Sequence, residues 1–306
     1  MDKINWGERF DNYVSEVKGD INEPNLFGNL ADPQDLIDKH MKKKRNGMGE
    51  KVKDKDADID YNNISYITND KSLKIVPFKT NKGGIKRTKN MESNTICAHP
   101  ASIIFNGKSG SGKSNLLLNL LTRKQFYKDY FDLIFFFSPS SKCDDLPKYL
   151  QLPEKRVFDK FDEKSMIDIL KTQEDIIKES GIEKSPKILI ILDDVQSEQR
   201  FLRSPIISTL FIRNRHLNIS TWLCGQSYTR TPRNCRLQAS GLFIFPGSQS
   251  EMDLLVDEYC PPRCYKKKFE EMLKFATKEK YHFMFINNQC DFESRYRKNM
   301  DEIISY

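Results

Sequence analysis

The eight residues Gly107-Lys-Ser-Gly-Ser-Gly-Lys113-Ser114 match the pattern G-x-x-x-x-G-K-[ST] at every specified position. A short apolar run, Ala101–Phe105, precedes them, and Asn115–Leu121 follows with the leucine spacing of a buried helix. In this context the backbone N–H groups of the glycine-rich turn and the N-terminus of the helix point at the same anion. The stretch therefore predicts an α/β fold built around a phosphate-binding loop.

The rest of the chain continues the alternation of strands and helical stretches. Apolar or alternating runs that read as strands are Leu133–Phe137, Lys187–Leu192, Ile219–Cys224, Leu242–Phe245 and Tyr281–Asn287. Between the first two, Met166, Leu170, Gln173 and Ile177 share one face of a helix that Asp162 is placed to cap. Uninterrupted apolar strands are typical of a sheet covered on both faces. We predict a P-loop NTPase fold of the RecA/ASCE type, a mostly parallel sheet flanked by helices.

Composition divides the chain of 306 residues into two parts. Residues 96–306 carry the predicted strands and are expected to form the nucleotide-binding domain. Residues 1–95 are expected to form a basic, partly flexible extension, because Met41–Arg45 is basic and Lys51–Asp60 is dense in charges of both signs. Within it we predict a short helix at Asp35–Met41. Strands are expected at Tyr66–Thr68 and Leu73–Phe78.

Net charge and cysteine content indicate the kind of partner and the cellular compartment to expect. The net charge of +7 mildly favours an acidic partner, and the seven scattered cysteines favour a reducing compartment over a disulfide framework. Cys260 and Cys264 have a spacing that starts some zinc sites, but no second Cys/His pair follows them, which disfavours structural zinc. No stretch approaches the roughly 20 apolar residues of a membrane span. We expect an intracellular, soluble protein.

The phosphate-binding loop predicts ATP and Mg²⁺ as ligands. Lys113 is expected to bring its ammonium group to the β- and γ-phosphates, and the Ser114 hydroxyl to ligate magnesium. The residues expected to cradle the nucleotide are Gly107, Lys108, Ser109, Gly110, Ser111, Gly112, Lys113 and Ser114. A chance match in a chain of this length is on the order of one per cent, given average glycine usage.

Two carboxylates, Asp193 and Asp194, follow the apolar run Ile188–Leu192 directly. The carboxyl ends of parallel strands form the ligand-binding edge of such sheets, so both acids are expected beside the phosphate loop. We assign Asp193 to the metal, held through water, and Asp194 to orienting or activating the attacking water. The alternative is a pair of solvated acids in a loop.

Polar residues around the next apolar run extend the predicted site. Gln226 ends the run Ser220–Gly225 and is expected to sense the γ-phosphate, with a simple surface glutamine as the alternative. Arg213 and Arg215 precede that strand, and either could reach into a neighbouring subunit and stabilise transition-state charge. A salt-bridged helix end explains the two arginines equally well.

Basic residues later in the chain are candidate contacts to DNA phosphates. These are Arg230, Arg233, Arg236, Lys266, Lys267, Lys268, Arg295 and Arg297. For each one singly, solvated charge on an exposed face is at least as good an explanation.

The phosphate loop, the strand closing in Asp193-Asp194, and Arg215-His-Leu-Asn-Ile-Ser leading to Gly225-Gln-Ser together resemble the poxvirus-type genome-packaging ATPases of large double-stranded DNA viruses and virophages, a branch of the FtsK–HerA superfamily. The resemblance covers about residues 96–290. It implies a homo-oligomeric ring of five or six subunits that hydrolyses ATP to move double-stranded DNA into a preformed capsid, where capsid proteins are further partners. It also implies the cytoplasm of a host cell, at the site of virus assembly, or association with the virion.

The same resemblance matches Lys113 and Ser114 to the family's Walker A residues, Asp193 and Asp194 to its Walker B pair, and Gln226 to its polar sensor. Arg213 or Arg215 matches the arginine that acts in trans, and the sequence does not choose between them. Many members of the wider superfamily have glutamate where Asp194 stands, and the shorter side chain weakens the assignment of Asp194 as the catalytic carboxylate.

Two other classes of protein share the phosphate loop. A nucleoside or nucleotide kinase needs an arginine-rich lid over an acceptor pocket, and the sequence has no convincing lid. A GTPase-type switch carries Asn-Lys-x-Asp late in its sheet, and the predicted core lacks this motif. The ordered arginine, glutamine and paired aspartates favour a multimeric hydrolase.

Overall fold

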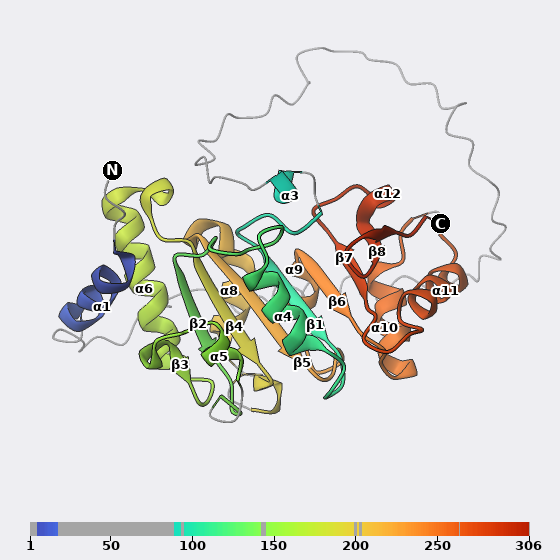
Figure 1. Cartoon of the computed structure of the whole chain (residues 1–306), viewed down its shortest axis with the longest axis horizontal. Coiled ribbons are helices and arrows are strands. Elements are labelled where there is room, and N and C mark those ends of the chain that lie inside the picture. The colour runs from blue at the N-terminus through green and yellow to red at the C-terminus, as the bar shows by residue number, and fades with distance from the viewer. Residues whose placement is uncertain are drawn as a thin grey trace, which may run out of the picture. The chain divides into compact units, whose positions relative to one another are not determined.

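A nine-stranded sheet forms the centre of the protein in a computed structural model (Figure 1). The structure describes residues 5–17, 89–92, 95–141, 145–198, 201, 204–262 and 264–305, all within one compact unit. The helix predicted at Asp35–Met41 and the strands predicted at Tyr66–Thr68 and Leu73–Phe78 lie outside the described residues.

The strand order is β3-β2-β4-β5-β1-β6-β7-β8-β9. The strands are β1 (Ser102–Asn106), β2 (Leu133–Phe137), β3 (Val157–Phe158), β4 (Ile188–Asp193), β5 (Ile219–Gly225), β6 (Gly241–Ile244), β7 (Met284–Asn287), β8 (Tyr296–Lys298) and β9 (Glu302–Ile303). The six strands from β3 to β6 pair in parallel, and β7 to β9 are antiparallel. The predicted mostly parallel sheet is therefore confirmed, with an antiparallel edge.

Helices connect the strands and cover the sheet. They are α1 (Trp6–Val17), α3 (Lys89–Glu92), α4 (Lys113–Thr122), α5 (Leu146–Tyr149), α6 (Glu163–Ser180), α8 (Pro205–Leu217), α9 (Arg233–Gln238), α10 (Gln249–Tyr259), α11 (Lys266–Ala276) and α12 (Phe292–Arg295). Short 3₁₀ helices within the described residues are η3 (Glu154–Arg156), η4 (Ile182–Lys184) and η5 (Val195–Ser197).

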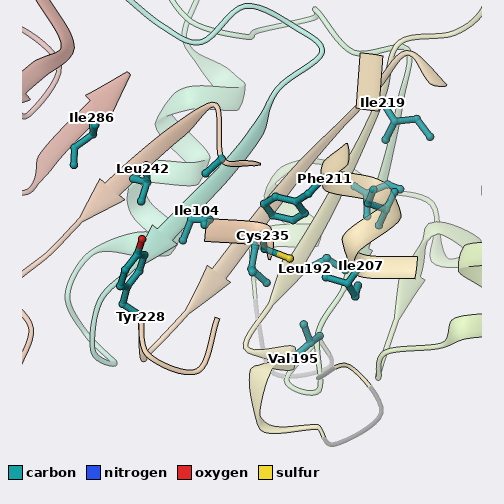
Figure 2. Close-up of a cluster of buried hydrophobic side chains, with 14 of the residues drawn as sticks. Ile104, Leu192, Val195, Ile207, Phe211, Ile219, Tyr228, Cys235, Leu242 and Ile286 are labelled. Carbon is teal, nitrogen blue, oxygen red and sulfur yellow. The ribbon is translucent and has the colours of Figure 1, made fainter. Parts of the chain in front are cut away.

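Strand β4 shows why its sequence is uninterruptedly apolar. Ile188, Ile190 and Leu192 face one hydrophobic cluster, which includes side chains of α6 and α8. Leu189 and Ile191 face a second cluster, which α4 covers from the other side. Figure 2 shows part of the first cluster, where Ile207 and Phe211 of α8 lie beside Leu192. Both faces of the strand are thus buried, as expected of a central parallel strand.

Helix α6 begins and ends at residues suited to those positions. Asp162 is its N-cap, and the carboxylate accepts a hydrogen bond from the Ser165 backbone N–H at 3.2 Å, as predicted. Gly181 ends the helix with φ at 79°. The buried face comprises Met166, Ile169, Thr172, Gln173 and Ile176. The predicted Leu170 and Ile177 are only partly buried, because the buried stripe is rotated by about one residue.

Helix α1 in the N-terminal segment was not expected from the sequence. Phe10 is 2% exposed, and its ring centroid lies 5.7 Å from that of Phe135 in β2. Arg9 contacts Glu179 of α6 at 3.9 Å, and Gly7 lies so close to Arg156 that a Cβ there would come within 2.8 Å of the guanidinium. The first described residues therefore pack against the folded core through Phe10.

Cys260 and Cys264 belong to a turn, where the Cys260 Sγ donates to the Cys264 carbonyl oxygen at 3.2 Å. Among the described residues there is no group of three or more His, Cys, Asp or Glu side chains placed to hold a metal ion. In the same part of the chain, no helix combines the length and the apolar character needed to cross a membrane.

Candidate nucleotide-binding site

The strand order brings three loops together at one edge of the sheet. Strand β5 lies between β1 and β4, with Asn106 in register with Gly225 and Cys224 in register with Asp193. Because the three strands are parallel, the loops that begin at Gly107, Asp194 and Gln226 leave the sheet side by side. The sequence-predicted phosphate loop, acid pair and glutamine therefore share one site.

The phosphate loop, residues 107–112, needs glycine at specific positions. Gly110 and Gly112 have φ of 73° and 107°, a region that side chains strain. At Gly107 a Cβ would come within 2.7 Å of the Phe245 Cβ and 2.6 Å of the Ser111 Oγ. Lys113 begins α4, is 8% exposed, and donates to the carbonyl oxygens of Gly107 at 2.6 Å and Lys108 at 3.3 Å. The Lys113 side chain therefore reaches back across the phosphate loop to its first two residues.

The acid pair lies opposite the first turn of α4. A cavity of about 470 Å³ is lined by Ser114 and Asn115 on one side and by Asp193 and Asp194 on the other, with Ser140 from the loop after β2. Ser114 is exposed, and Asp193 is 6% exposed. A hydroxyl and carboxylates on one cavity are the hard oxygen donors that Mg²⁺ prefers, so these residues fit a magnesium ion. Ser114 and Asp193 are the residues that would hold it.

Asp194 adopts an uncommon backbone conformation that aims it at Gln226. Its φ is 51°, and its backbone N–H still donates to the Cys224 carbonyl at 3.0 Å. The Gln226 Nε2 donates to the Asp194 Oδ2 at 3.0 Å. The Asp194 Oδ1 is buried and has no hydrogen-bond partner among the described residues. A hydrogen bond thus fixes one oxygen of the Asp194 carboxylate, and the other oxygen can still accept a hydrogen bond.

Sequence reasoning missed Gln196, which connects the acid pair to the loop after β5. Gln196 lies in η5 and is 5% exposed, and its Nε2 donates to the Thr231 Oγ1 at 2.7 Å. A Cβ at Gly225 would overlap the Gln196 carboxamide, so this approach requires glycine. The one sequence signal for it was Gly225 itself, a glycine at the end of a buried strand.

Arg213 and Arg215 lie away from this site. Both are exposed residues near the end of α8, and Asn214 between them donates to the Ser102 Oγ at 3.2 Å, at the first residue of β1. That end of β1 is opposite the phosphate loop. Arg213 forms an ion pair with Glu174 at 2.7 Å, in agreement with the salt-bridge alternative. The structure does not bring either arginine to the acid pair of the same subunit.

The structure corrects two of the predicted DNA contacts. Arg236 is 8% exposed and is bound by Glu258, with Nη2 to Oε1 at 2.9 Å, while its Nη1 donates to the Thr231 carbonyl at 2.6 Å. Arg297 is also 8% exposed and donates to the Met300 carbonyl. Both side chains are held inside the fold because packing and internal acceptors compete with solvent.

The other basic residues that are candidate DNA contacts differ in how exposed their side chains are. Arg230, Arg233, Lys267 and Lys268 are exposed. Lys266 is exposed but forms an ion pair with Asp257 at 2.7 Å. Arg295 is partly buried and donates to the Cys290 carbonyl.

A family model described as Poxvirus A32 protein matches residues 88–302, more than two thirds of the chain. The chain belongs to this family. The resemblance to poxvirus-type packaging ATPases that the motifs indicated is therefore confirmed, and the residues matched to the A32 family include every predicted site residue.

Among curated proteins, the chain is similar to uncharacterized protein 075L of Invertebrate iridescent virus 6, at 26% identity over 156 residues. The match covers 50% of this chain and 57% of that protein, so it spans little more than half of the relative's length. Among solved structures, it is similar to the genome packaging NTPase B204 of Sulfolobus turreted icosahedral virus 2 in complex with AMP. Identity is 15%, coverage is 62% of this chain and 93% of that one, and the TM-score is 0.45. EssC of Geobacillus thermodenitrificans is similar at 17% identity, covering 51% and 34%, with a TM-score of 0.38.

Proposed function

We propose that this P-loop ATPase of the A32 family moves double-stranded DNA into a viral capsid, and that ATP hydrolysis at the edge of β1, β4 and β5 powers the movement. The observation that carries the proposal is the connection between the acid pair and an exposed basic loop. Residues 227–232 follow Gln226 directly, and Gln226 itself is bonded to Asp194.

Buried Tyr228 and Thr231 hold that loop in place, and it carries an exposed arginine, Arg230. Thr231 is 1% exposed and accepts a hydrogen bond from Gln196, three residues beyond Asp193 in the chain. Arg230 in the loop and Arg233 just after it are exposed. A shift of the acid pair during hydrolysis would therefore reach both arginines through one buried hydrogen bond. DNA held by its phosphates would move with them, with little preference for sequence.

The chemistry in the site follows from the residues at its edge. Lys113 supplies a cation to the phosphates, and Asp194, with one oxygen held by Gln226, is placed to orient or activate the attacking water. Bound magnesium would supply charge neutralisation at the phosphate oxygens. Replacing Asp193 with Asn should weaken ADP binding in the presence of Mg²⁺ much more than in its absence, which calorimetry would measure directly.

Ring assembly is the second part of the proposal. Arg213 and Arg215 lie at the opposite edge of the sheet from their own acid pair, so either one serves hydrolysis only by reaching a neighbour. Because Arg213 is bound to Glu174, Arg215 is the stronger choice for the acting residue. Mixing Arg215→Ala subunits with Lys113→Ala subunits should restore activity at mixed interfaces, whereas an arginine acting within its own subunit gives no restoration.

The main test is steady-state ATP hydrolysis with and without long double-stranded DNA. The arginine variant replaces Arg230 and Arg233 with Gln, and Lys113→Ala is the inactive control. A matched variant replaces Lys124 and Lys128, exposed lysines that follow the C-terminal end of α4, with Gln in the same way. We expect DNA stimulation that Lys113→Ala abolishes, that the arginine variant reduces, and that the matched variant retains.

Binding measured against salt gives an independent readout. Each arginine–phosphate interaction that a variant removes should lower the slope of log affinity against log salt by about one. The arginine variant should therefore reduce the slope by about two, and the matched variant should leave it unchanged. Hydrolysis that is indifferent to DNA, with a salt slope near zero in the wild type, would refute the translocase and direct attention to small phosphate acceptors.

A further inference from the structure

A second cavity begins at the phosphate loop, on the other side of α4 from the acid pair. Its volume is about 700 Å³. One wall is a single face of α4 and its N-cap, with Gly112, Asn115 and Asn119 at helical spacing. The opposite wall comes from residues near β6 and β7, among them Phe245 and Tyr281.

The position of the acids determines which end of a nucleotide faces each cavity. Ser114, Asp193 and Asp194 line the first cavity, so the terminal phosphate of a bound nucleotide lies on that side. The sugar and base must leave the loop elsewhere. Asn115 lines both cavities, and Gly112, the last residue of the loop, lines only the second of the two. The sugar and base of a nucleotide bound at the phosphate loop would therefore lie in the second cavity.

Tyr281 has the features of a residue held in place for a ligand. Its side chain packs on the phosphate loop, where a Cβ on Gly112 would lie 3.4 Å from its Cδ1, yet the residue is 55% exposed. Its φ is 70°, a conformation that non-glycine residues rarely adopt and that functional sites often retain. The Lys280 ammonium lies 4.8 Å from the ring centroid. An aromatic ring that is more than half exposed, with Lys280 over one face, thus lies at the end of the loop.

The walls of the cavity suit a flat heterocycle with a polar edge. Phe245 and Phe283 line the same cavity as Tyr281, and their ring centroids lie 5.3 Å apart. Asn115 and Asp301 add an amide and a carboxylate to its lining. Aromatic faces stack with nucleobases, and amide groups hydrogen-bond their edges.

We propose that this cavity binds the nucleobase and ribose of the nucleotide and that the ring of Tyr281 stacks on the base. The inference rests on the proposed nucleotide-binding function and adds to it the place of the base. It makes Tyr281 a residue that contributes affinity for nucleosides while leaving affinity for phosphate unchanged.

The test compares ADP with inorganic pyrophosphate, since pyrophosphate lacks the nucleoside. Binding of each ligand in the presence of Mg²⁺ is measured by calorimetry. Where a ligand binds too weakly for direct titration, its affinity is measured from its competition with ADP. The loss-of-ring variant is Tyr281→Asn, because asparagine tolerates positive φ. Tyr281→Phe keeps the ring, and Tyr265→Asn is a matched control at another exposed tyrosine.

We expect Tyr281→Asn to weaken ADP binding by about tenfold, as for the loss of one base–aromatic stack, and to leave pyrophosphate binding unchanged. Tyr281→Phe and Tyr265→Asn should bind both ligands as the wild type does. Equal losses for ADP and pyrophosphate, or no loss for ADP, would overturn the inference.

The outcome separates this inference from the translocase proposal. A selective loss of ADP binding with hydrolysis indifferent to DNA would retain the base site and remove the translocase. A wild-type protein that binds neither ligand would overturn both.

Discussion

His99 should make the folded protein sensitive to mild acid. It is 3% exposed, with Nδ1 2.7 Å from the Ser220 Oγ and Nε2 2.8 Å from the Asn218 Oδ1. The Ala101 backbone N–H donates to the same Ser220 oxygen, so the hydroxyl proton is available to His99, and a neutral ring satisfies both contacts. Burial lowers the pKa of His99 from 6.5 to about 3.

The sign and size of the effect follow from this pKa. Below pH 6.5 the unfolded chain binds a proton at His99, whereas the folded chain does not until the pH nears 3. The stability contributed by the neutral ring is complete above pH 6.5 and is lost as the pH falls toward 3. The free energy of unfolding should decrease by about 1.4 kcal/mol per pH unit well below pH 6.5, or about 2 kcal/mol between pH 7.5 and 5.0.

Urea unfolding of the wild type and His99→Gln at these two pH values tests the calculation. Glutamine can hydrogen-bond but does not titrate, so the variant should be less stable at pH 7.5 and lose about 2 kcal/mol less on acidification. Acid effects from carboxylates are common to both proteins and cancel in the comparison. If the two proteins lost equal stability, or if the NMR signals of His99 titrated near pH 6.5, the reasoning would be refuted.

Three further predictions concern packing and buried contacts in the fold. Gly225→Ala should cost about 1–3 kcal/mol by overpacking Gln196, and Gln196→Ala in the same chain should recover part of that loss in a double-mutant cycle followed by thermal unfolding. Arg236→Gln should cost about 3 kcal/mol in urea unfolding by leaving the largely buried Glu258 carboxylate with the Tyr228 hydroxyl but without its cationic partner, while the salt slope of DNA binding stays unchanged. Phe10→Ala should cost about 3–5 kcal/mol in stability and leave ADP affinity unchanged in calorimetry at a temperature where the variant is folded.

Much of the fold could be predicted because periodicity and turn chemistry are local signals. The apolar run Ile188–Leu192 required a strand buried on both faces, and the loop 107–112 required glycines with free backbone angles. Asp162 could be recognised as an N-cap from its neighbours alone. The shared edge of the acids, the loop and Gln226 followed from parallel pairing of their strands.

The rest depended on tertiary contacts that one sequence does not encode locally. Arg236 is basic, as a contact to DNA phosphate would be, and only the tertiary fold brings Glu258 beside it. Helix α1 lies in a polar segment, and its role depends on Phe10 meeting Phe135 across a long stretch of chain. The cavity at Tyr281 joins α4 to residues near β7, so no motif in either part indicates it.

The place of β5 between β1 and β4 has a consequence for how the protein folds. Gly107, Asp194 and Gln226 are far apart along the chain and meet only after two parallel ladders have formed, which is slow because long loops must close first. Nucleotide should therefore find no partly formed site in the unfolded chain, and a fragment ending before β5 should not bind it. Bound ligand would stabilise the folded state alone, so the rise in midpoint temperature on adding ADP reports the assembly of the whole central sheet.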